Sequence, residues 1–101
     1  MKIRLLSSAF NDLARGRDFY EQQGEDLGGY FFDSLSSDID SLVLYAGIHQ
    51  KIFGFYRMLS KRFPYAIYYR VETGNEVVVY RVLDCRQNPV RIRASLKKTH
   101  E

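Results

Sequence analysis

Hydrophobic positions in the first half of the chain recur every three or four residues, which is the spacing of amphipathic helices. Before them, residues 2–6 begin with alternating polar and apolar side chains and predict a short strand. The pair Ser7-Ser8 then offers a helix N-cap, and the spacing that follows predicts a helix over about residues 8–23. A second apolar stripe, Leu27–Ala46, predicts another helix that ends at Gly47. The short join between the two predicts a helical hairpin.

The second half of the chain carries short runs of aromatic and β-branched residues, which are typical of strands. These runs predict strands over residues 55–59, 65–72 and 76–84, whereas residues 48–54 predict a loop. Asn88-Pro89 matches an N-cap followed by proline, which indicates a possible short C-terminal helix. The element order is therefore β-α-α-β-β-β. It predicts an α+β fold in which the helical hairpin packs on one face of an antiparallel sheet.

The pair Gly74-Asn75 predicts a two-residue hairpin loop, and such a loop fixes the register of the last two strands. In that register one face is almost wholly apolar or aromatic, so we expect it to pack on the helices: Tyr65, Ile67, Tyr69, Val71, Val78, Tyr80 and Val82. The opposite face is expected to be open and to carry basic and tyrosine side chains around an apolar patch: Tyr68, Arg70, Arg81, Val77, Val79 and Leu83. Exposed patches of this kind often mark a partner site.

The net charge of +3 hides an asymmetry between the two halves. Residues 1–50 carry four basic and eight acidic side chains, whereas residues 51–101 carry eleven basic and four acidic ones. A strongly basic half suggests an anionic partner, either nucleic acid or an acidic protein. Basic residues interleaved with tyrosines on an open sheet face fit nucleic-acid binding. The alternative is a solvated basic surface with no partner.

Several kinds of chemistry receive little support from the residue inventory. The single cysteine, Cys85, cannot form an internal disulfide, which fits a reducing cytoplasm, and we expect a small buried residue there. Two histidines and one cysteine are too few for a closed zinc site, and no glycine-rich phosphate loop is present. His49 and His100 fall outside the predicted elements. Each is either a surface residue or a candidate general acid or base. We expect no cofactor, no metal and no membrane span.

Two stretches of the second half carry a pattern with a family resemblance. The first contains Arg62-Phe63-Pro64-Tyr65 followed by Ile67 and Tyr69, and the second contains Val77, Val79 and Val82-Leu83 before a basic residue. Together with Ala9, Asp12-Leu13 and Phe19-Tyr20 in the first helix, this pattern resembles the RelE/ParE superfamily of toxins from type II toxin–antitoxin modules. The resemblance covers nearly the whole chain. It implies a single toxin domain over residues 1–101 with the element order given above.

The resemblance implies a small cytoplasmic protein that inhibits bacterial growth and is neutralised by a cognate antitoxin. RelE-like members cleave mRNA on the ribosome with a cluster of basic residues, and ParE-like members inhibit DNA gyrase. Arg57 and Arg86 fall near two basic positions of the nuclease pattern, so they are the candidate catalytic residues. Ala66 and Leu59 replace two other basic positions of that pattern, which favours the ParE-like reading.

The candidate contacts with a target or partner lie on the open sheet face and in the basic C-terminal run. They are Arg62, Tyr68, Arg70, Arg81, Val77, Val79, Leu83, Arg91 and Arg93. DNA gyrase is the expected target of a ParE-like protein, and the ribosome with its mRNA is the alternative. A third alternative is a non-toxic homologue that only binds an antitoxin.

Overall fold

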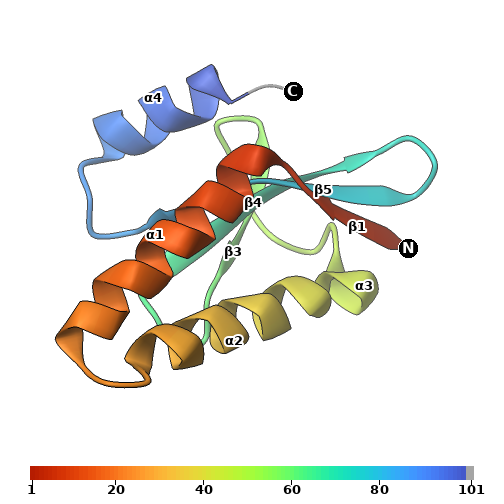
Figure 1. The fold of residues 1–101 in the computed structure, drawn as a ribbon. Coiled ribbons are helices and arrows are strands. Elements are labelled where there is room, and N and C mark those ends of the chain that lie inside the picture. Colours follow the sequence, from red (N-terminus) through yellow and green to blue (C-terminus); the bar gives the residue numbers. More distant parts are fainter. Residues whose placement is uncertain (100–101) are drawn as a thin grey trace.

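The computed structural model describes residues 1–99 and has an α+β fold built around one mixed sheet (Figure 1). The described part contains five strands, in the sheet order β1-β5-β4-β3-β2. Four helices accompany them. The elements are β1 Lys2–Leu5, α1 Ser7–Gln23, α2 Leu27–Asp40, α3 Leu42–Tyr45, β2 Lys51–Ile52, β3 Phe55–Leu59, β4 Tyr65–Glu72, β5 Glu76–Asp84 and α4 Pro89–Lys98. The predicted α+β class and the order of the main elements are confirmed.

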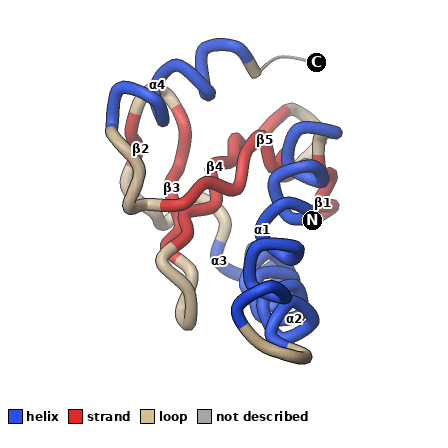
Figure 2. Tube along the Cα trace, turned by 60° about the vertical axis from the view of Figure 1, so that its left-hand side comes forward, coloured by secondary structure: helices blue, strands red, loops and turns tan. Residues whose placement is uncertain are grey.

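Helices α1 and α2 form the predicted hairpin and cover one face of the sheet, whereas α4 lies over the opposite face (Figure 2). The hairpin is close-packed where α1 crosses α2. A Cβ atom on Gly28 would lie 2.6 Å from the carbonyl oxygen of Arg17, and one on Gly16 would lie 2.5 Å from the ring of Phe31. Both glycines therefore let the two helices approach closely, and a larger side chain at either position would push them apart.

The second predicted helix is divided in the structure. Helix α2 ends at Asp40, and the four-residue helix α3 follows after Ser41. The hydroxyl of Ser41 donates to the carbonyl oxygen of Asp38 at 2.6 Å, a local hydrogen bond of the kind that bends helices. Gly47 adopts a positive φ of 94° just beyond the last helical turn, as its predicted role as a helix stop requires.

Two short strands extend the predicted meander into a five-stranded sheet. Strand β1 pairs in parallel with β5, which places Lys2–Leu5 at one edge. The segment predicted as a loop contains β2, whose Lys51 and Ile52 pair with Tyr56 and Phe55 of β3 at the other edge. The predicted cap at Ser7-Ser8 is wrong, because the Ser8 hydroxyl instead donates to the carbonyl oxygen of Tyr80 at 2.7 Å.

The register of the β4–β5 hairpin differs from the prediction over half of its length. Glu72 opposes Glu76 across a three-residue turn, whereas Tyr68 opposes Arg81 as expected. A bulge beside Tyr80 absorbs the one-residue difference between the two registers. Since side chains alternate along a strand, the residues between turn and bulge exchange faces. Val77 and Val79 are consequently fully buried against the helical hairpin, so their predicted place on the open face is wrong.

The opposite face of the sheet, called the outer face below, is covered by α4. Ile92 and Leu96 of α4 pack on an apolar cluster formed by Phe55, Ala66, Tyr68 and Leu83, with Tyr80 at its edge. The Asn88 side chain accepts a hydrogen bond from the Val90 amide at 2.8 Å, which confirms the predicted N-cap. Leu83 therefore lies beneath α4, and its predicted exposure is wrong.

Candidate functional site

Exposed basic residues are spread over the described part of the chain, and four of them lie on α4: Arg91, Arg93, Lys97 and Lys98. Four of the predicted contact residues are exposed in the described structure: Arg62, Arg70, Arg91 and Arg93. They remain candidates for contact with an anionic target. The other predicted contact residues are buried or half-buried, because packing or ion pairing holds them within the fold.

Arg81 forms an ion pair with Asp12 of α1, and this pair is nearly closed to solvent. The guanidinium donates from Nε to Oδ2 at 2.7 Å and from Nη2 to Oδ1 at 2.8 Å, a bidentate arrangement. The Asp12 and Arg81 side chains are only 4% and 15% exposed. The Nη1 atom of Arg81 donates to the carbonyl oxygen of Ser95 at 3.3 Å and to the Thr99 hydroxyl at 3.2 Å. Arg81 thus joins α1, β5 and α4, and its predicted place on an open face is wrong.

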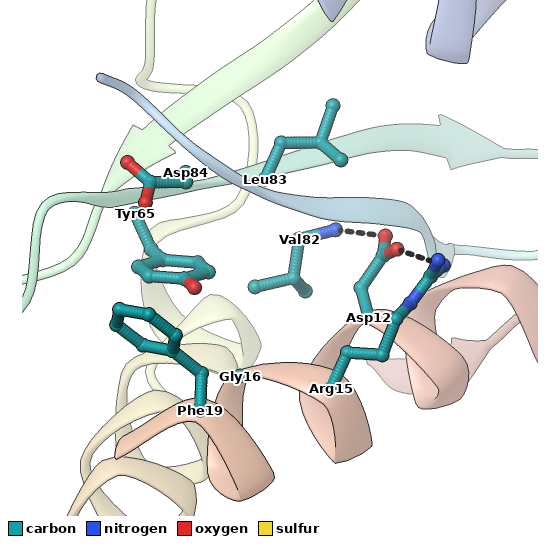
Figure 3. Close-up of a pocket in the computed structure, with 8 residues that line it drawn as sticks. All are labelled: Asp12, Arg15, Gly16, Phe19, Tyr65, Val82, Leu83 and Asp84. Carbon is teal, nitrogen blue, oxygen red and sulfur yellow. Dashed lines mark hydrogen bonds and ion pairs between the residues drawn. The ribbon is translucent and has the colours of Figure 1, made fainter. Parts of the chain in front are cut away.

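The ion pair between Asp12 and Arg81 was not predicted from the sequence. Besides the guanidinium, Asp12 accepts from the Val82 amide at 2.9 Å and from Nη2 of Arg15 at 3.3 Å (Figure 3). The one available signal was its position in the first-helix part of the family pattern. A buried carboxylate with this many donors fixes the position of α1 on β5.

Tyr68 is also closed to solvent, so its predicted role on an open face does not match its position. It is 2% exposed, and it lies opposite Arg57 in the pairing of β3 with β4. Burial raises the pKa of the Tyr68 hydroxyl, and the charge of Arg57 partly offsets that effect. The ring is therefore unavailable for stacking on a nucleic-acid base while α4 covers the face.

The two candidate catalytic residues lie near Cys85. The charges of Arg57 and Arg86 both favour the Cys85 thiolate, but partial desolvation outweighs them and raises the pKa of the thiol. A raised pKa leaves the thiol protonated at neutral pH, which is the opposite of an activated nucleophile. Taken over the whole residue, Cys85 is exposed to solvent, so its predicted burial is wrong.

Arg86 is engaged by Asp84 in a bidentate ion pair. The distances are 3.0 Å from Nε to Oδ1 and 2.7 Å from Nη2 to Oδ2. The hydrogen bond from Arg86 lowers the pKa of Asp84 and raises the pKa of Arg86 itself. Asp84 is therefore ionised at neutral pH and neutralises much of the positive charge that Arg86 could offer to a phosphate.

An open groove of about 230 Å³ runs between α1 and β5 beside this pair (Figure 3). Phe19 and Tyr65 form its apolar part, and Asp12 and Asp84 lie at its two ends. Burial, together with the charge of Asp84, raises the pKa of Tyr65 to about 12. Both carboxylates are already held by arginines, so the groove offers shape and apolar surface but no free acid or base.

Neither a metal centre nor a membrane span emerges from the described residues. Over residues 1–99 no three histidine, cysteine, aspartate or glutamate side chains gather in a way that could hold a metal ion. None of the helices in this part of the chain is long and apolar enough to cross a membrane.

Comparison with known proteins places the chain in a family. The family model described as the ParE toxin of type II toxin–antitoxin system, parDE, matches residues 3–89. Among solved structures, a chain from the "Chromosomal ParDE TA system from P. aeruginosa" superposes with a TM-score of 0.73 at 21% identity. That match covers 81% of this chain and 92% of the other, and at this identity it speaks for the fold alone. A search of the curated proteins found no match. On the family match, the predicted RelE/ParE resemblance is confirmed on its ParE side, and the chain belongs to the family of ParE toxins of type II toxin–antitoxin systems.

Proposed function

We propose that this chain is a growth-inhibiting toxin that acts on DNA gyrase in the cytoplasm and is neutralised by a cognate antitoxin. The observation that carries the proposal is the match to the ParE toxin family over residues 3–89. In this proposal residues 1–101 act as one toxin domain, and the protein works by binding its target rather than by cleaving a bond.

The pairing of two arginines with carboxylates supports target binding rather than phosphodiester cleavage. Cleavage of RNA by a cluster of cations requires positive charge directed at the reacting phosphate. Here Arg81 is neutralised by Asp12, and Arg86 is neutralised by Asp84. Where nuclease relatives carry basic residues, this chain has Ala66, which is buried, and Leu59, which has no charge. Arg57 alone is a weak basis for a ribonuclease.

Exposed apolar side chains around α3 support the presence of a protein partner. Leu44 and Ile48 are 78% and 73% exposed. Tyr45, Ile48 and Leu59 line one hollow of about 400 Å³. Exposed apolar surface of this kind is costly in water and is common where another protein binds. An antitoxin segment that covers it would remove this surface from water.

The deciding experiment is a pair of assays on the purified toxin, namely gyrase supercoiling and ribosome-dependent mRNA cleavage. We expect inhibition of supercoiling with the mRNA left intact. Expression without an antitoxin should stop growth, and co-expression with the antitoxin encoded beside it should restore growth. A variant carrying both Arg57→Ala and Arg86→Ala should remain toxic if no bond is cleaved. Cleaved mRNA with unaffected supercoiling would overturn the gyrase proposal.

A further inference from the structure

A second groove, distinct from the one beside Asp84, lies between α4 and the β2–β3 turn. Its volume is about 400 Å³, within the range of small-ligand pockets. Its lining combines aromatic rings with cations and contains no acidic side chain: Phe53, Phe55, Arg70, Arg93, Leu96 and Lys97, with Thr99 at the end. It includes two of the exposed arginines already identified as contact candidates.

Phe53 is held in this groove at a conformational cost. Phe53 and Gly54 form a two-residue turn between paired Ile52 and Phe55, and both have positive φ, of 56° and 83°. This is the pattern of a type I′ turn, for which Asn-Gly is the preferred sequence. A bulky side chain at positive φ is a genuine outlier, and such outliers cluster at functional sites. The ring is also 46% exposed, so burial does not explain why phenylalanine stands there.

The cations of the groove are arranged over its rings. The Arg93 guanidinium lies 5.6 Å from the centre of the Phe53 ring, and that of Arg70 lies 4.1 Å from the Phe55 ring. Arg93 and Lys97 are four residues apart on one helix, a spacing at which like charges repel. Within residues 1–99 no carboxylate pairs with Arg70, Arg93 or Lys97, in contrast to Arg81 and Arg86. An external anion would relieve that repulsion.

We propose that this groove binds one nucleotide of a single-stranded nucleic acid, with the base on Phe53 and the phosphate between Arg93 and Lys97. Stacking on an aromatic ring beside cations that hold the backbone is the general mode of single-strand recognition. A duplex keeps its bases stacked on one another, so only an unpaired base can reach the ring. An acidic peptide would use the cations but would leave the exposed, strained ring unexplained. The inference goes beyond the proposed action on gyrase and does not depend on it.

The test is fluorescence anisotropy of the full chain with labelled oligothymidylate of about eight nucleotides, a length within known single-strand site sizes. We expect this probe to bind more tightly than a duplex of the same length or polyglutamate of equal charge. Phe53→Asn should weaken binding about tenfold or more, since a stacked base contributes strongly to affinity. The same variant creates the preferred Asn-Gly turn, so its thermal midpoint should not fall. Phe53→Asn would therefore lose affinity for the oligonucleotide without losing thermal stability.

Matched variants separate the groove from general electrostatics. Arg93→Ala and Lys97→Ala should each reduce the slope of log K against log salt by about 0.7. Lys98→Ala removes one charge from the same helix outside the groove, and Phe10→Leu removes an exposed ring from α1; both should retain single-strand preference and the Phe53 effect. Phe53→Leu serves as a second variant if Phe53→Asn fails to fold. Failure to bind oligothymidylate, equal binding of polyglutamate or duplex, or unchanged binding by the Phe53 variants would each overturn the proposal. None of these outcomes bears on gyrase inhibition.

Discussion

The two faces of the sheet are covered in different ways. On one face, two long helices bury a continuous apolar core that includes Phe31, Leu35, Ile67 and Tyr69, each fully buried. On the outer face, the ten-residue α4 covers a smaller cluster. The first face holds the larger buried cluster, and the second combines a smaller cluster with cations of β4 and α4 such as Arg70, Arg93 and Lys97. The comparison indicates that the hairpin side provides most of the buried core, whereas the α4 side carries a groove lined by aromatic rings and cations.

The largest expected effect is at Asp12, which connects the two sides. Asp12→Ala should cost about 3–5 kcal/mol in the free energy of unfolding, because it leaves Arg81 buried without its carboxylate. Urea unfolding followed by circular dichroism measures this cost. Asp18→Ala on the same helix is the matched control, since Asp18 and its partner Arg17 are exposed. An equal cost for the two variants would show that the buried pair does not link the faces.

The next effect distinguishes the two faces directly. Leu35→Ala on the hairpin side should cost about 2–5 kcal/mol and lower the global stability. Leu96→Ala on α4 should cost less and act locally, because a short terminal helix can detach while the hairpin core stays folded. Native-state hydrogen exchange would then show faster exchange in α4 and unchanged exchange in β4. Loss of protection throughout the sheet in the Leu96 variant would contradict the separation of the two faces.

A smaller, pH-dependent effect is expected on the hairpin side at His49. The Tyr69 hydroxyl accepts from the Gly47 amide at 2.9 Å and is hydrogen-bonded to Nδ1 of His49, to which it donates when the neutral ring carries its proton on Nε2. Burial lowers the pKa of His49 below its ordinary value of 6.5. The stability contributed by the neutral ring is therefore present above pH 6.5 and is lost as the pH falls below it.

The measurement for His49 is the urea midpoint between pH 8 and pH 5, together with the histidine titration by NMR. We expect Tyr69→Phe to reduce the pH dependence, because it removes the hydrogen-bond partner of His49. Asp38 and Lys61 line the same hollow, so Lys61→Met is a useful control for a nearby charge. A His49 pKa above 6.5 would contradict the lowering of its pKa by burial.

The smallest effect is expected for the exposed pair at the end of β5. Asp84→Asn should change the free energy of unfolding by less than about 1 kcal/mol at neutral pH, since Arg86 is largely in water. The pKa of Asp84 is lowered, so this contribution is present above pH 3.8 and disappears as the pH falls through the lowered value. Thermal unfolding at pH 7 and pH 3 checks both parts. A large loss at pH 7 would mean that this pair is as structural as Asp12 and Arg81.

Local patterns were sufficient to predict most of the elements. The apolar stripe of α1, the aromatic runs of β4 and β5, and the Asn88-Pro89 cap depend on neighbouring residues, and each was found near its predicted place. The register of β4 and β5 was not predictable in this way. The Gly74-Asn75 pair is compatible with turns of two or three residues, and the choice depends on the bulge several residues away.

The candidate site was predicted less well than the fold, for a physical reason. Whether an arginine is free or paired depends on contacts between distant segments, and Arg81 and Asp12 are 69 residues apart in sequence. The run of aromatic and β-branched residues placed Arg81 on the correct strand but could not show the carboxylate that pairs with it. Arg70, Arg91 and Arg93 were predicted as contacts and are exposed, but their role remains a prediction.

The parallel pairing of β1 with β5 has a consequence for the timing of folding. Lys2 lies beside Glu76, so this edge of the sheet can close only after nearly the whole sequence to β5 has been synthesised. The Asp12–Arg81 ion pair also needs β5, so α1 can be fixed on β5 only after that strand has been synthesised. Contacts this distant in sequence slow folding, because a long loop must close before they form. A chain still on the ribosome that lacks β5 therefore cannot complete the sheet.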